Sequence, residues 1–233
     1  ALQNGIFTLT PSQAMADAMH LEYGGIRPTT IYNSFSIQLR KYTNPPSNQI
    51  PDNQKFRIAW ISQWIGHGRG LDRMLIYLQQ LNIEIEIHLA GNIRSGYDEY
   101  LINLASRKGQ IQLYFHPILH PSHIVSWLAQ FDAGIASEPI TSYITDLTVS
   151  NKLFYYLLAG IPVIAFKTLG QVEIANTAPN AIIICDQNPD ALTVIDSWQK
   201  KSENYHLARG QSHSAGSQYC WENQSVILAD LLK

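Results

Sequence analysis

The chain has 233 residues, of which 45% are hydrophobic and only 15% charged, and its formal net charge is −2. A chain of this length and composition can form one α/β domain with a buried core and part of a second domain. Lys and Arg form no cluster, which argues against nucleic acid as a partner. No apolar run approaches the roughly 18 residues that span a bilayer, although peripheral contact with a membrane stays open. Two cysteines favour a cytoplasmic protein without disulfide bonds.

The first forty residues predict a β-α-β unit. Residues 6–9 have the composition of a short strand, and Ser12 follows as a candidate N-cap. The helix expected over 14–23 ends at the glycine pair 24–25, and a second β-rich run covers 29–32. A unit of this size is a fragment of an α/β domain.

Residues 43–54 lack periodicity and are rich in Pro, Asn and Gln, which predicts a linker and a domain boundary. After this linker, short apolar strands alternate with amphipathic helices. Strands are expected at 56–61, 84–90, 112–115, 133–136, 162–166 and 182–184. Helices are expected at 71–80, 98–107, 123–130, 151–158, 190–201 and 222–232. This alternation predicts an α/β fold, a doubly wound parallel sheet whose ligand site lies at the carboxyl ends of its strands.

A glycine-rich loop directly follows the first of these strands. Gly66, Gly68 and Gly70 let the backbone approach a ligand closely, and the next helix directs its free N–H groups toward the same place. Arg69 adds a positive charge whose fork geometry suits phosphate oxygens. A surface turn with a solvated arginine explains the loop equally well. The spacing matches neither the dinucleotide-binding nor the Walker motif, which disfavours NAD- and ATP-dependent chemistry.

A second candidate anion site lies where the helix over 151–158 begins. Ser150 is a candidate N-cap, and the first turn offers backbone N–H groups. Lys152 is expected on the side of the helix that also carries Tyr155 and Tyr156, where its ammonium can reach a bound anion. An ordinary capped helix with an exposed lysine carries equal weight.

The two stretches together resemble a known family. SNKLFYYLLAGIPVIAF is similar to the donor-site signature of retaining GT-B glycosyltransferases, which include sucrose synthase, glycogen synthase and many polysaccharide-building enzymes. IGHGRGLDRMLIYLQQL resembles the first phosphate loop and helix of that family, and YCWENQSVILADLL resembles its closing helix. YFHPILHPSHIVSWLAQFDAGIAS and TLTPSQAMADAMHLEYGGIRPTTIYNSF are also similar to family segments. In order along the chain, the resemblance accounts for residues 6–36 and 55–233.

The resemblance implies a Rossmann-like GT-B C-terminal domain with a β-α-β remnant of the N-terminal domain. Residues 1–42 would be the end of the acceptor-binding domain, 43–54 the linker and 55–233 the nucleotide-sugar-binding domain. The implied reaction transfers a glycosyl unit from a UDP-, GDP- or ADP-linked sugar to an unknown acceptor, with retention of configuration. Neither a metal ion nor another cofactor is expected.

The resemblance also assigns roles to individual residues. Arg69 and Lys152 would be the catalytic pair that neutralises the donor diphosphate, since bond cleavage leaves extra negative charge on the leaving group. The other donor-binding residues that it implies are Gly66, Gly68, Gly70, Ser150 and Asn151 around the diphosphate, His116, Pro117 and Ile118 at the nucleobase, and Tyr155 near the ribose. Taken by itself, His116 is better explained as a histidine at a strand end.

Two positions depart from the family pattern. Most relatives carry a glutamate for the ribose hydroxyls where this chain has Tyr155, and an earlier acidic position corresponds to Leu147. Glu138 and Asp146 are expected in the same loop, where either carboxylate could substitute for the missing acidic residues, although the expectation for both is a surface carboxylate. These departures, and the incomplete acceptor half, keep open a non-catalytic, degenerate nucleotide-sugar-binding or interaction module. A sugar-nucleotide epimerase of the same fold is a third alternative.

The histidines at 116, 120 and 123 lie close together in the sequence. They span a strand end and a proline-containing loop, and no carboxylate or cysteine is spaced to complete a zinc shell. A metal site is therefore not expected.

Overall fold

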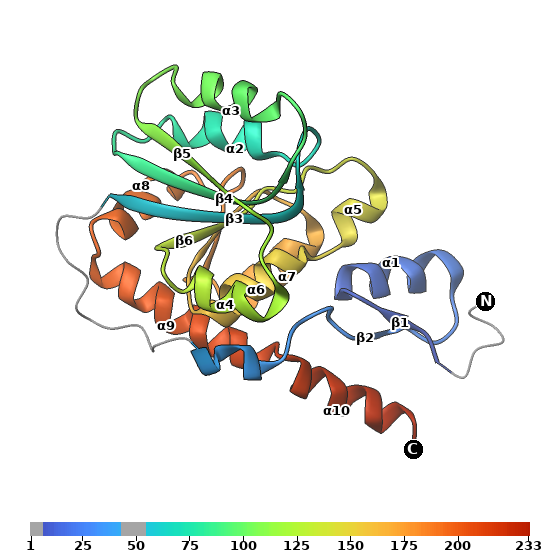
Figure 1. Cartoon of the computed structure of the whole chain (residues 1–233). Coiled ribbons are helices and arrows are strands. Elements are labelled where there is room, and N and C mark those ends of the chain that lie inside the picture. The colour runs from blue at the N-terminus through green and yellow to red at the C-terminus, as the bar shows by residue number, and fades with distance from the viewer. Residues whose placement is uncertain (1–6, 43–54) are drawn as a thin grey trace.

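The computed structural model describes residues 7–42 and 55–233, so the predicted linker at 43–54 lies outside the described residues. The larger part of the molecule is a parallel sheet of six strands in the order β5-β4-β3-β6-β7-β8 (Figure 1). These strands are β3 (Phe56–Ile65), β4 (Ile85–Ile93), β5 (Ile111–His116), β6 (Ala133–Ala136), β7 (Val163–Ala165) and β8 (Ile182–Ile184). The expected doubly wound α/β fold is confirmed.

Helices cover both faces of the sheet. On one face lie α2 (Leu71–Leu78), α3 (Tyr97–Ala105) and α8 (Ala191–Gln199) (Figure 1). They pack on an apolar core that includes the fully buried Trp60. The other face carries α4 (Pro121–Leu128), α6 (Asn151–Ala159) and α7 (Leu169–Thr177). Strands that are buried on both faces need continuous apolar sequence, which explains the Ile- and Val-rich runs in β7 and β8 and the small apolar residues of β6.

Several boundaries differ from the expected ones. β3 runs four residues farther than predicted because a bulge between Ile61 and Trp64 lets it continue beside β4. The sequence patterns missed α5 (Tyr143–Leu147), α7, α9 (Glu203–Gln218) and the 3₁₀ helix η1 (Ile37–Tyr42). None of the helices in the described part of the chain is long and apolar enough to cross a membrane.

The expected β-α-β unit is also present. β1 (Leu9–Thr10) pairs in parallel with β2 (Thr29–Thr30), and α1 (Gln13–Tyr23) connects them. The Ser12 hydroxyl caps α1 by accepting a hydrogen bond from the Met15 amide at 3.1 Å. Residue 6 of the predicted first strand lies outside the described residues. A pair of strands and one helix cannot form a core of their own, so this unit depends on contacts with the larger sheet.

Those contacts come from α7 and from the last helix of the chain. Glu173 on α7 accepts hydrogen bonds from the first two amides of α1, at 3.0 and 2.8 Å. The last helix, α10 (Trp221–Leu231), runs back beneath the β-α-β unit (Figure 1). Its Glu222 carboxylate accepts hydrogen bonds from the Ser36 hydroxyl at 2.5 Å and the Ile37 amide at 2.9 Å.

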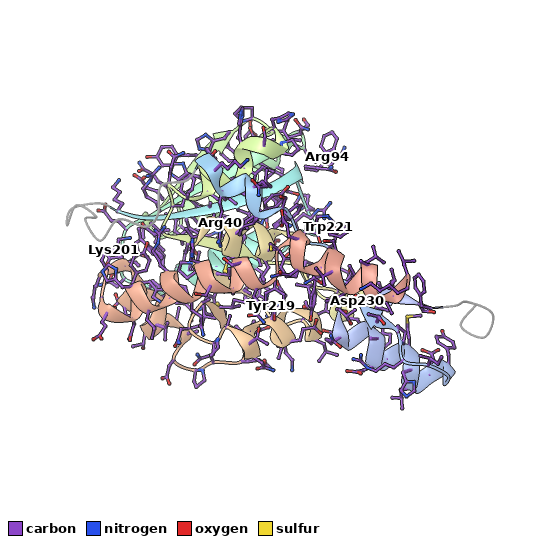
Figure 2. All side chains as sticks on the ribbon, turned by 90° about the horizontal axis from the view of Figure 1, so that it is seen from below. Arg40, Arg94, Lys201, Tyr219, Trp221 and Asp230 are labelled. Carbon is purple, nitrogen blue, oxygen red and sulfur yellow. The ribbon has the colours of Figure 1, made fainter. Side chains whose placement is uncertain are left out.

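Arg40 fixes η1 to the larger domain (Figure 2). Its guanidinium donates to the Leu158 carbonyl at 2.7 Å, the His213 carbonyl at 2.7 Å and the Ser217 hydroxyl at 2.6 Å. A cation is favourable at the carbonyl end of α6, where the helix dipole is negative. The segment that follows β2 is therefore attached to α6 and α9 before the undescribed stretch begins.

Candidate functional site

The sheet creates a crevice between β3 and β6. The chain passes from β3 through β4 to the edge strand β5 and then returns to the opposite side of β3 with β6. Ligands of open α/β sheets bind where the strand order reverses in this way, outside the carboxyl ends of the strands. A pocket of about 530 Å³ lies there, lined by Phe35, Ile61, Ser62, Gln63, Arg69, Ala90, Ile118, Leu119, Pro121, Ile124, Asn151, Lys152 and Tyr155.

The glycine-rich loop connects the end of β3 to α2. Gly70 is the N-cap of α2 with a φ of 70°, and a Cβ built there would lie 1.9 Å from the Ser137 carbonyl oxygen. Gly68 has a φ of 76°, but nothing lies within 4 Å of its Cβ position. Gly66 is buried against the stem of Arg94. Gly66 and Gly70 therefore shape the loop, and Gly68 is exposed at its surface.

Arg69 stands between these glycines. Its side chain is exposed, and its guanidinium makes no ion pair with any residue that the structure describes. Its carbonyl accepts a hydrogen bond from the Ser137 hydroxyl at 3.0 Å, which joins the loop after β3 to the loop after β6. A fixed backbone with an unpaired guanidinium is a suitable arrangement for a phosphate group.

The start of α6 forms the facing wall. Ser150 is the N-cap by position, but its side chain makes no capping hydrogen bond, unlike the predicted role. The Lys152 ammonium forms an ion pair with the Glu138 carboxylate and lies 5.4 Å from the centre of the Trp60 ring. The side chain of Lys152 is 14% exposed. The lysine is thus held inside the site and not on the solvated surface.

The expectation that both tyrosines of α6 share the side of Lys152 is wrong for Tyr156. Tyr156 is fully buried, and its hydroxyl donates to the Ile135 carbonyl at 2.9 Å. Tyr155 does line the pocket, where its ring stacks on Phe35 with a centroid distance of 3.5 Å and an angle of 17°. Burial raises the pKa of the Tyr155 hydroxyl, so it stays neutral at physiological pH.

A second pocket of about 220 Å³ adjoins the first, and Arg69 lines both. Its walls are rich in hydroxyl groups and consist of Gly68, Arg69, Glu138, Pro139, Thr141, Thr145, Thr148, Ser150, Thr168 and Gln171. The Gln171 amide nitrogen donates to the Phe166 carbonyl at 2.7 Å, whereas its buried oxygen Oε1 has no partner among the described residues. Such unpaired, buried acceptors are rare in proteins because they cost free energy.

The prediction that Glu138 and Asp146 are surface carboxylates needs correction for Glu138, which is partly buried. Glu138 pairs with Lys152 through Oε1, and its other oxygen is buried without a hydrogen bond in the described part of the chain. Asp146 accepts a hydrogen bond from the Leu169 amide at 2.9 Å, at the start of α7. The sequence placed both in the right loop, but loop composition alone does not reveal which carboxylate points inward.

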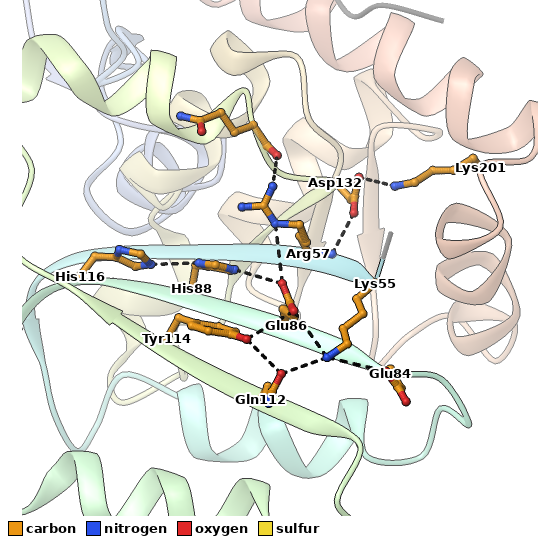
Figure 3. A network of polar contacts seen from close by, with 11 residues as sticks. Lys55, Arg57, Glu84, Glu86, His88, Gln112, Tyr114, His116, Asp132 and Lys201 are labelled. Atoms are coloured by element: carbon orange, nitrogen blue, oxygen red, sulfur yellow. Dashed lines mark hydrogen bonds and ion pairs between the residues drawn. The ribbon is translucent and has the colours of Figure 1, made fainter. Parts of the chain in front are cut away.

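His116 and Pro117 line neither of these two pockets, whereas Ile118 lines the larger one. His116 ends β5, and its Nε2 lies 2.9 Å from Nδ1 of His88 on β4 (Figure 3). Burial and the nearby Arg57 lower the pKa of both imidazoles, that of His88 to about 4. Both rings are therefore neutral near pH 7 and belong to a polar network on the face of the sheet.

His120 caps α4 by accepting from the Ser122 amide. Within residues 7–42 and 55–233, no three His, Cys, Asp or Glu side chains gather in a way that would hold a metal ion. Side chains and a helix terminus supply positive charge at the site. The structure brings Arg69, Lys152 and the first amides of α6 around one crevice, where an anion such as a diphosphate would meet two cations and a positive helix end.

Phe35 and Gln171 are residues of the site that the sequence patterns missed. Phe35 comes from the segment after β2, more than a hundred residues from Tyr155 in the chain, and no local periodicity links the two. Gln171 was missed because its helix, α7, was not predicted. A polar residue directly after Gly170 offered no pattern that separates it from a surface loop.

No family model matches this sequence, and no curated protein matches it. Solved structures do match the fold. Anabaena HepE in complex with UDP-glucose has a TM-score of 0.73 and 20% identity, and the match covers 100% of this chain and 65% of that one. A glycosyltransferase from Rickettsia africae has a TM-score of 0.69 and 14% identity, with coverage of 100% and 65%.

The TarM protein of S. aureus, in a complex that contains UDP, has a TM-score of 0.65 and 13% identity, covering 99% of this chain and 44% of that one. The present chain thus spans less than two thirds of the length of HepE, the Rickettsia enzyme and TarM. Its architecture matches the GT-B fold of these structures, with a six-stranded Rossmann-like sheet and an additional β-α-β unit.

Proposed function

We propose that this chain binds a nucleoside diphosphate sugar in the crevice between β3 and β6 and serves as the donor-binding part of a glycosyltransferase. The observation that carries the proposal is the arrangement of Arg69, in the loop after β3, and Lys152, in the first turn of α6, which line one pocket. Structural neighbours with the same fold were solved with UDP or UDP-glucose, which makes UDP the first nucleotide to test.

In the proposed complex, the diphosphate lies between the Arg69 guanidinium and the Lys152 ammonium. The nucleoside occupies the larger pocket beside Ile118 and Tyr155, and the glycosyl unit occupies the smaller, hydroxyl-rich pocket. Cations and oriented amides stabilise the charge that develops on the leaving diphosphate, so the reaction proceeds without a metal ion. Transfer with retention to an acceptor, which we leave unspecified, completes the proposal.

Thermal unfolding with nucleotides tests the proposal. UDP, GDP and ADP are added at millimolar concentration, and we expect at least one to raise the melting temperature because it binds only the folded state. Arg69→Ala should remove most of the shift. Arg107→Ala, which removes an exposed arginine in the loop after α3, is the matched control and should keep the shift. No shift with any of the three nucleotides would refute donor binding.

The rival function is a non-catalytic binding module, and Tyr155 is the residue that favours it. A neutral phenol cannot accept the pair of ribose hydrogen bonds that a carboxylate accepts. We therefore compare Tyr155→Glu with Tyr155→Gln, which removes the stack on Phe35 without adding charge. An affinity for UDP more than about tenfold higher in the glutamate variant alone would identify a decayed donor site. Similar affinities in both variants would indicate a site organised around Tyr155, as the transferase proposal expects.

A further inference from the structure

The ion pair between Lys152 and Glu138 connects the two pockets of the site. Lys152 lines the larger pocket, Glu138 lines the smaller one, and Arg69 lines both. We propose that Glu138 makes the site prefer the intact nucleotide sugar over the free nucleotide. This inference rests on the proposed function and assigns a specificity-determining role to a carboxylate that stands at neither of the family positions considered in the sequence.

Only one carboxylate oxygen of Glu138 has a partner among the described residues. One oxygen pairs with Lys152, while Oε2 is buried and makes no hydrogen bond to the described residues. The side chain is 25% exposed, and that of Lys152 is 14% exposed, so water screens the pair weakly. Any hydrogen-bond donor that reaches the free oxygen stabilises a carboxylate in this environment, because charge-assisted hydrogen bonds are about twice as strong as neutral ones.

A free nucleoside diphosphate competes with Glu138 for Lys152. When the phosphate takes the ammonium, the carboxylate loses the one ion pair that it makes with the described residues and remains partly buried. Separating a partly buried pair and leaving one charge uncompensated is unfavourable. The free nucleotide therefore binds against the cost of breaking this ion pair.

An intact nucleotide sugar offsets that cost. A glycosyl unit in the smaller pocket brings hydroxyl donors to Glu138, and the unpaired oxygen of Gln171 is a second acceptor at the same pocket. The Thr and Ser hydroxyls of the walls can donate or accept as the sugar requires. Once the sugar has been transferred, Glu138 regains Lys152 and promotes release of the nucleoside diphosphate.

Isothermal titration calorimetry with UDP and UDP-glucose tests the inference on the wild-type chain, Glu138→Gln and Asp146→Asn. In Glu138→Gln we expect UDP to bind more tightly, because Lys152 no longer has a competing anion. The affinity for UDP-glucose should increase less, because the neutral amide is a weaker acceptor for the sugar hydroxyls. The ratio of Kd for UDP to Kd for UDP-glucose should therefore fall about tenfold.

Asp146→Asn is the matched control, since it removes the same charge from the segment between β6 and α6 at a position outside both pockets. Its Kd ratio should equal that of the wild type. Glu138→Asp keeps the charge on a shorter side chain and should give an intermediate ratio, which preserves the test if the glutamine variant does not fold.

An unchanged ratio in Glu138→Gln, or an equal change in Asp146→Asn, would overturn the role of Glu138. If the wild type still binds both ligands through Arg69 in that case, the proposed function survives and only this inference fails. If the wild type binds neither ligand, both fail together.

Discussion

Gly68 and Gly70 share a left-handed backbone but differ in their surroundings. Both have φ near the value that only glycine adopts easily, 76° and 70°. The Gly70 Cα lies against the Ser137 carbonyl, whereas open space surrounds Gly68. Gly70 therefore sets how closely the loop that carries Arg69 approaches the loop that carries Glu138. The alternate glycine spacing predicted a close approach of the backbone, but it did not reveal which glycine meets protein and which meets solvent.

Alanine substitution separates the two effects. Gly68→Ala should lower the free energy of unfolding by about 1–2 kcal/mol, the cost of a left-handed conformation. Gly70→Ala adds a steric clash with the Ser137 carbonyl, a backbone group that cannot rotate away. We therefore expect the free energy of unfolding to fall by about 3 kcal/mol or more in total. Urea denaturation with a constant m-value measures both. Equal losses in the two variants would mean that the loops separate freely, and Gly70 would then not control the spacing of the site.

Among the elements, strands were predicted better than helices. The patterns identified β6 and β8 with their observed bounds because each is an unbroken apolar run between turn residues. They missed α9, whose buried side includes Ala208, Ser212 and Gly216 in place of large apolar residues. Close packing explains this composition, since a Cβ at Gly216 would lie 2.3 Å from the Leu157 carbonyl oxygen of α6. A helix that packs through small residues has no apolar stripe for a sequence pattern to detect.

The polar network across β3, β4 and β5 is another element-level feature that sequence did not predict. His88 packs against Tyr114 and Phe131, contacts His116 at 2.9 Å and faces the charges of Glu86 and Arg57 (Figure 3). The histidine expected at the nucleobase thus has a partner within the sheet. A histidine next to an apolar run gives no sign of which neighbour will meet it, because strand order decides that contact.

This network predicts a stability that depends on pH. The pKa of His88 is lowered to about 4 by burial, then by Arg57 and His116, against an unfolded value of about 6.5. The unfolded chain therefore binds more protons in this window, and stability falls as the pH drops from about 6.5 toward 4. His88→Asn should lose about half or more of the decrease in unfolding free energy between pH 7 and pH 5. His206→Asn, at an exposed position, is the control for urea titrations at both pH values. An unchanged pH dependence in His88→Asn would assign the effect to other groups.

At the scale of the whole molecule, the candidate site depends on both ends of the chain. Phe35 reaches the pocket because the segment around it is fixed at two points. Arg40 of η1 donates a hydrogen bond to α6, and Glu222 of α10 accepts one from the Ile37 amide. The sequence resemblance predicted a helix at the end of the chain, which is α10, and it placed Arg69 and Lys152 at one site; in the structure both residues line the larger pocket. The resemblance did not predict the stack of Phe35 on Tyr155, which requires the β-α-β unit to be placed against α6 by contacts between residues far apart in the sequence.

The contribution of this unit to ligand binding can be measured through Phe35→Ala. The substitution removes one wall of the larger pocket and the ring that orders Tyr155. An aromatic pair contributes about 0.5–1.5 kcal/mol beyond its buried area, so we expect Kd for UDP to rise about twofold to tenfold in calorimetry. Phe7→Ala, an exposed phenylalanine of the same unit outside the pocket, is the control and should leave Kd unchanged. The melting temperature without ligand shows whether each variant is folded. If Phe35→Ala is folded and binds UDP as the wild type does, the nucleotide does not use this end of the pocket, and the base must lie nearer Ile118 and Ile124, away from the β-α-β unit.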